Sequence, residues 1–203
     1  MKNFAFARRR DEERNQMFQR TRDYAKDYEK IGSTVHYKGK HYRFEIEQPA
    51  LNRRKAVYVF SLVAALVLFV FIGVSKSPAL GAGGGPAPVY VLIPYVGLLL
   101  PLGLGLARAV LLAFKSRPLE YAEYDKNLVQ QKGVLLSALI LNGLLLLGMI
   151  VFLLFSKSNF SAQWIAIAEA AVCAACIFLA FRQYHALFEA VAIDEPISVR
   201  YDI

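Results

Sequence analysis

Residues 133–155 read GVLLSALILNGLLLLGMIVFLLF, which is 23 residues without a charged side chain. Three more runs, 56–74, 88–114 and 161–181, are of similar length, and each contains at most one charged residue. About 20 helical residues cross the roughly 30 Å hydrocarbon core of a bilayer. Backbone groups in lipid must be hydrogen-bonded within their own segment, so continuous apolar runs predict helices. We therefore predict an all-α integral membrane protein with four transmembrane helices.

The composition excludes several other classes of protein. The chain has 203 residues, of which 56% are hydrophobic and 20% are charged, and 15 of its 24 Lys and Arg residues precede residue 56. A typical soluble domain is only about half apolar, and disordered chains are more polar still. Two cysteines in a chain of this length do not form a disulfide framework. A soluble enzyme, a disordered chain and a disulfide-stapled secreted domain are therefore excluded.

The positive charges predict the orientation. The N-terminal arm (1–55), the middle loop (115–132) and the C-terminal end from residue 182 hold 21 Lys and Arg residues. The other two connections hold one each, Lys76 and Lys157. The positive-inside rule therefore predicts that both termini lie in the cytoplasm. We attribute the net charge of +8 to this bias and to attraction to anionic headgroups, with no nucleic-acid partner. We expect a multi-pass protein of a cell membrane and favour a bacterial plasma membrane.

The arm and the tail (183–203) predict a small cytoplasmic α+β unit. Apolar residues at spacings of three and four predict a helix over 9–31. Alternating apolar and polar residues predict a β-hairpin over 34–47 that turns at its Lys-Gly pair. The same alternation predicts a strand over 197–203, which would pair with the hairpin as a third strand. The alternative is a frayed tail and an arm that lies on headgroups. The middle loop is predicted to contain a further helix.

Polar residues within the predicted spans are the candidates for function, because they are costly in lipid. Glu169 lies about 12 Å inside the fourth span, as a protonatable site or cation ligand, or as a protonated carboxyl bonded to another helix. Asn142, in the third span, is a possible partner for it. Arg108, in the second, would extend to the interface or pair with Glu169. Cys173 and Cys176 share a helix face with Glu169, and we interpret them as packing residues.

No catalytic constellation is evident. His36 and His41 would be neighbours across the predicted hairpin, but no third ligand accompanies them. We therefore predict no catalytic residues, no metal and no cofactor. The residues expected to contact anionic lipid or a partner on the cytoplasmic surface are Arg8, Arg9, Arg10, Arg53, Arg54 and Lys55.

Taken together, the sequence favours a non-enzymatic scaffold or accessory subunit of a membrane assembly. Its partner would be another membrane protein or a second copy of this chain. The alternative is a small oligomeric transporter or channel, with Glu169, Asn142 and Arg108 along the pathway. An enzyme is the weakest of the three hypotheses, because water-facing nucleophiles and convergent carboxylates are not evident.

Overall fold

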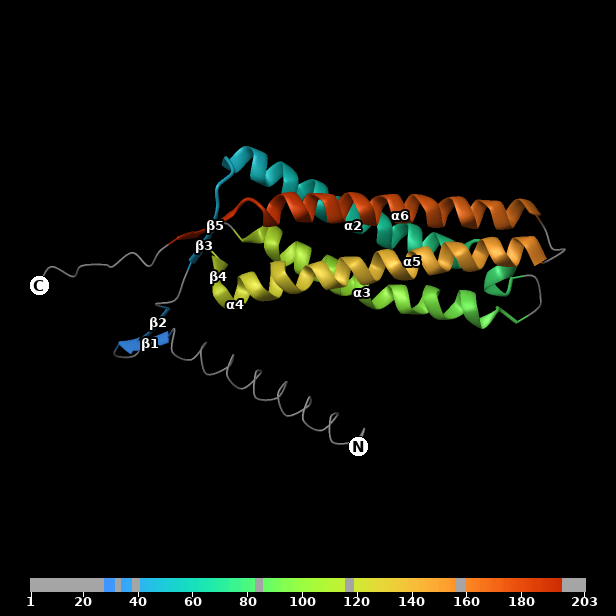
Figure 1. The fold of residues 1–203 in the computed structure, drawn as a ribbon, viewed down its shortest axis with the longest axis horizontal. Coiled ribbons are helices and arrows are strands. Elements are labelled where there is room, and N and C mark those ends of the chain that lie inside the picture. The colour runs from blue at the N-terminus through green and yellow to red at the C-terminus, as the bar shows by residue number, and fades with distance from the viewer. Residues whose placement is uncertain are drawn as a thin grey trace, which may run out of the picture.

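Four long helices lie side by side in the computed structural model (Figure 1). They are α2 (Gln48–Val74), α3 (Val89–Phe114), α5 (Gln130–Phe155) and α6 (Phe160–Phe188). All four are long and apolar enough to span a membrane, which confirms the four predicted helices. The structure describes residues 28–31, 34–37, 41–82, 86–115, 119–155 and 160–194.

Each helix packs against the next one along the chain, and α6 closes the bundle against α2. The order is therefore up-down-up-down, which is a common arrangement where the connections are short. The helices α2 and α6 extend beyond the predicted spans, because a helix does not end where its apolar run ends. A short helix, α4 (Tyr121–Tyr124), and a π-helical turn, η2 (Asp125–Val129), lead directly into α5. A 3-10 turn, η1 (Pro78–Leu80), lies between α2 and α3.

A small sheet covers the end of the bundle where α2 begins, and we call this end the sheet end (Figure 1). Its central strand is β3 (His41–Phe44), which pairs antiparallel with β4 (Leu119–Glu120) on one side and β5 (Val191–Asp194) on the other. Tyr42 of β3 is buried and stacks on Tyr124 of α4, with ring centroids 4.0 Å apart. The sheet therefore joins the arm, the middle loop and the end of α6.

The predicted strand pairing is wrong. Strand β2 (Thr34–Tyr37) pairs with β1 (Tyr28–Ile31), and not with β3, so no hairpin spans 34–47. The last four residues of the predicted helix over 9–31 form strand β1 instead. The earlier part of that predicted helix lies outside the described residues. The predicted strand over 197–203 also lies outside them. Strand β5, which pairs with β3, follows α6 after a two-residue turn. The bundle holds the end of α6 and the middle loop beside β3, so both edges of β3 have partners.

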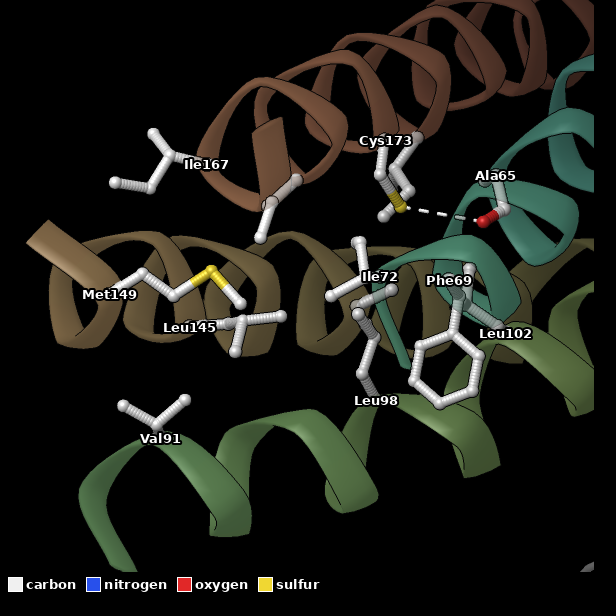
Figure 2. Close-up of a cluster of buried hydrophobic side chains, with 14 of the residues drawn as sticks. Ala65, Phe69, Ile72, Val91, Leu98, Leu102, Leu145, Met149, Ile167 and Cys173 are labelled. Atoms are coloured by element: carbon white, nitrogen blue, oxygen red, sulfur yellow. Dashed lines mark hydrogen bonds between the residues drawn. The ribbon is translucent and has the colours of Figure 1, made fainter. Parts of the chain in front are cut away.

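The middle of the bundle is filled by apolar side chains from all four helices (Figure 2). Phe69 and Ile72 of α2 lie beside Leu98 of α3. Leu145 and Met149 of α5 lie between Val91 of α3 and Ile167 of α6 in this view. A second apolar cluster fills the sheet end. In each helix only 28 to 33% of the most apolar window is buried inside the bundle, so its outer surface is largely apolar too.

Candidate functional site

Asn142 is fully buried in α5, between Ala138 and Leu145 of the apolar core. Neither its Nδ2 nor its Oδ1 atom has a hydrogen-bond partner among the described residues. Asn142 is therefore not bonded to Glu169, the partner that the sequence suggested. A buried amide with both polar atoms unpaired is unfavourable, because its desolvation is not compensated.

Glu169 lies on α6 beside Ala166, Ala170 and Cys173, which are all fully buried. Its side chain is only partly exposed, and its Oε2 atom is buried with no hydrogen-bond partner among the described residues. The thiol of Cys173 donates instead to the carbonyl oxygen of Ala65 at 3.4 Å (Figure 2), which agrees with a packing role. Glu169 and Asn142 are thus two separate unpaired polar groups within an apolar region.

Arg108 lies near the sheet end of α3 and contacts the start of α5. Its Nη2 donates to Oε1 of Gln130 at 3.4 Å, and Gln130 in turn donates to the carboxylate of Asp125 at 3.0 Å. Its Nη1 atom is buried and unpaired among the described residues, where no ion pair joins Arg108 to Glu169. Arg108 therefore links two helices rather than contributing to one polar path with Glu169.

Gln131 connects three helices through its side chain, and it was not among the residues predicted from the sequence. Its fully buried Nε2 donates to the hydroxyl of Tyr58 at 2.6 Å and to the carbonyl oxygen of Gly105 at 3.0 Å. These contacts join α5 to α2 and α3. The hydroxyl of Tyr184 adds a bond from α6 to the carbonyl oxygen of Leu128 in η2, at 2.8 Å. In the sequence, Gln131 is marked only by its position beside an apolar run, which does not reveal its hydrogen-bond partners.

Gln163 has the equivalent position at the opposite end of the bundle. Its Oε1 accepts from the hydroxyl of Ser77 at 2.8 Å and from the amide of Ala79 at 3.4 Å. Its Nε2 donates to the carbonyl oxygen of Met149 at 3.4 Å. One buried amide therefore holds the connection between α2 and α3 against α5 and α6.

The three consecutive cations at the start of α2 have different environments. Lys55 is only 5% exposed, and its Nζ donates to the carbonyl oxygen of Lys115 at 2.8 Å and lies 5.2 Å from the ring centre of Phe44. Lys55 is therefore buried, which corrects the expectation that it lies on the cytoplasmic surface and contacts anionic lipid or a partner there. Because that carbonyl lies just past the end of α3, the ammonium group caps the negative end of this helix.

Arg54 has a similar role at the end of α6. Its Nη1 donates at 3.3 Å to the carbonyl oxygen of Ala186, in the last turn of that helix. Arg53 is exposed and forms no hydrogen bond or ion pair with any residue that the structure describes. The remaining predicted surface cations, Arg8, Arg9 and Arg10, lie outside the described residues.

Arg53 and Arg54 line a groove between the start of α2 and the end of α6. The groove has a volume of about 530 Å³, and no acidic side chain of the described residues lines it. Its lining residues are Pro49, Ala50, Arg53, Arg54, Val57 and Gln183.

No group of three His, Cys, Asp or Glu side chains that could hold a metal ion occurs in the described part of the chain. The chain matches no protein-family model, no curated protein and no solved structure. A function must therefore be argued from the geometry alone.

Proposed function

We propose that the four helices cross a lipid bilayer, with the sheet end in the cytoplasm. The support for the first part is the outer surface, which carries large exposed apolar side chains along every helix, such as Phe60, Leu100 and Phe178. Soluble monomers rarely expose apolar patches larger than a few hundred Å². The support for the orientation is the concentration of Lys and Arg in the segments that meet at the sheet end. We favour a bacterial plasma membrane as the location.

Within that membrane, we propose a non-enzymatic role as a scaffold or accessory subunit of a membrane assembly. The observation that supports it is the contrast between interior and exterior. Apolar side chains of two clusters occupy the interior, whereas about two thirds of the most apolar part of each helix faces outward. Such a protein can act through contacts of its outer helix faces with another membrane protein.

Photo-crosslinking in native membranes tests this role. A photoreactive amino acid is introduced at one exposed position on each helix: Val70 (α2), Leu100 (α3), Leu147 (α5) and Phe178 (α6). A scaffold or accessory subunit gives a discrete adduct with a different protein from at least one face. The same variants, purified and reconstituted at high dilution in lipid vesicles, are the matched control and should give none. Only lipid adducts from all four faces in native membranes would contradict the proposal.

The alternative function is a small oligomeric transporter or channel. It is favoured by two observations, the unpaired Oε2 of Glu169 and the unpaired amide of Asn142. Such polar groups in a membrane interior often serve ions or protons. In an oligomer, a second copy could complete a path that one bundle does not contain.

A flux assay separates the two functions. Glu169→Gln retains hydrogen bonding but cannot ionise, so an ion pathway would lose most of its proton or cation flux in liposomes. A scaffold would show no flux above protein-free liposomes in either form. The control is Glu189→Gln, which removes an exposed carboxylate at the sheet end. Gln163→Glu would not serve as a control, because the amide of Gln163 is hydrogen-bonded to Ser77.

A further inference from the structure

The start of α2 provides three consecutive positive charges, of which only one is not engaged by the described part of the protein. Successive helical residues point about 100° apart, so the three side chains face different neighbours. Lys55 caps α3, and one nitrogen of Arg54 caps α6. Arg53 is exposed at the groove between α2 and α6. A cation that stabilises no contact within the described chain is available for a ligand.

The groove combines features that suit an anion attached to an apolar group. Two guanidinium groups and the amide of Gln183 offer donors, while Pro49, Ala50 and Val57 provide an apolar wall. The first turn of α2 has no acidic residue, and the side chain of the N-cap residue Glu47, which precedes it, forms no cap bond. The backbone N–H groups of Gln48 and Ala50 therefore have no side-chain cap. The positive end of the helix dipole therefore adds to the arginine charges.

We propose that this groove binds a phosphate group, and specifically the headgroup phosphate of an anionic phospholipid. Arginine presents planar pairs of N–H donors that match phosphate oxygens. Basic pockets between membrane-spanning helices on the cytoplasmic side bind such headgroups. The acyl chains would then lie along the exposed apolar face of α2, toward Phe60 and Val67. This inference rests on the membrane placement in the proposed function, but not on the accessory role.

Native mass spectrometry of the purified full-length chain in detergent tests the site. Bound phosphatidylglycerol is counted against zwitterionic phosphatidylcholine for the wild type, Arg53→Gln and Arg182→Gln. Arg182 is the matched control, because it is an exposed arginine near the sheet end of α6 and does not line the groove. We expect Arg53→Gln to weaken retention of phosphatidylglycerol about fivefold, and Arg182→Gln to change it less than about twofold.

A second arm distinguishes the source of the phosphate. If a lipid headgroup is the ligand, excess inorganic phosphate gives no adduct of its own and does not displace phosphatidylglycerol. If inorganic phosphate binds in an Arg53-dependent manner and displaces the lipid, the phosphate chemistry is upheld and the lipid source is overturned. Equal retention in both variants overturns the site. Loss of a co-isolated protein in Arg53→Gln, with lipid retention unchanged, also overturns it, because the groove is then a protein contact.

The accessory role is read separately, from the crosslinks at the outer helix faces. A chain that binds phosphatidylglycerol through Arg53 but forms no protein adduct would retain this site and lose the accessory role. Protein adducts without Arg53-dependent lipid binding would retain the accessory role and overturn the site.

Discussion

Two regions of this bundle differ in the hydrogen bonds that their polar side chains form between helices. At the sheet end, Gln131, Lys55 and Tyr184 each bond to a helix or turn other than their own, although Oε1 of Gln131 and Nη1 of Arg108 have no partner among the described residues. In the middle, neither polar atom of Asn142 nor the Oε2 of Glu169 has a partner among the described residues. The difference indicates that polar contacts fix the helix arrangement at the sheet end, whereas close packing fixes it in the middle. Four substitutions test this difference. The free energy of unfolding of each variant is measured by SDS titration in mixed micelles, followed by circular dichroism.

The largest effect is expected at Gly148, where α5 packs closely against α3. A Cβ atom there would be 3.1 Å from the carbonyl oxygen of Tyr90 and 3.3 Å from Cγ2 of Val91. Gly148→Ala should therefore lower the free energy of unfolding by about 2–3 kcal/mol, since backbone must move. Gly143→Ala is the control on the same helix, because nothing lies within 4 Å of its Cβ position. Equal stability of the two variants would show that the helices are not in close contact there.

Gln131→Leu removes two bonds between helices and deprives the buried hydroxyl of Tyr58 of its partner. Hydrogen bonds between membrane helices contribute about 0.6 kcal/mol on average, and a buried hydroxyl that loses its partner adds to the loss. We expect the free energy of unfolding to fall by about 2 kcal/mol. Gln130→Leu, at the neighbouring exposed position, should cost less than half as much. If both variants lose the same amount, the network around Gln131 does not stabilise the bundle.

Lys55→Met retains the apolar stem of the side chain but removes the ammonium group that caps α3 and lies over Phe44. Helix capping by a cation and a cation–π contact are each small, so we expect a loss of about 1 kcal/mol. Arg53→Met removes an exposed cation two positions away and should leave the stability unchanged. A loss of stability in Arg53→Met but not in Lys55→Met would contradict the assignment of the cap to Lys55.

Asn142→Leu should have the smallest effect and the opposite sign. Replacing an unpaired buried amide by an apolar side chain of similar volume removes a desolvation penalty, so the stability should rise by about 0.5–1 kcal/mol. The same unfolding titration measures it beside Gln131→Leu. A clear loss of stability would mean that Asn142 has a partner in the membrane, such as a second copy of the chain, and would favour the transport alternative.

The four helices could be predicted from the sequence because the length of an apolar run directly reports the ability to span a bilayer. The ends of α2 and α6 could not, since residues such as Arg53, Arg54 and Lys55 continue the helix while interrupting the apolar run. The strand pairing was also beyond reach. Strands of two to four residues carry a weak alternation, and the partners of β3 come from segments about 75 and 150 residues away.

The candidate sites follow the same division. The positions of Asn142 and Glu169 within apolar helices were evident from the sequence, because polar residues are conspicuous there. Their lack of a partner among the described residues was not, since it depends on which helix faces meet. The network of Gln131 and the cap formed by Lys55 depend on contacts between residues 26 to 73 positions apart, so adjacency in the sequence gave no indication of either.

The most direct test of the central claim is the mass of the assembly isolated from its native membrane in a mild detergent. The chain, tagged and gently solubilised, is analysed by native mass spectrometry and by composition together. We expect a stoichiometric complex in which this chain of 22.7 kDa accompanies another membrane protein. A homo-oligomer without a companion would shift the account to the transport alternative, and a lone monomer would contradict it.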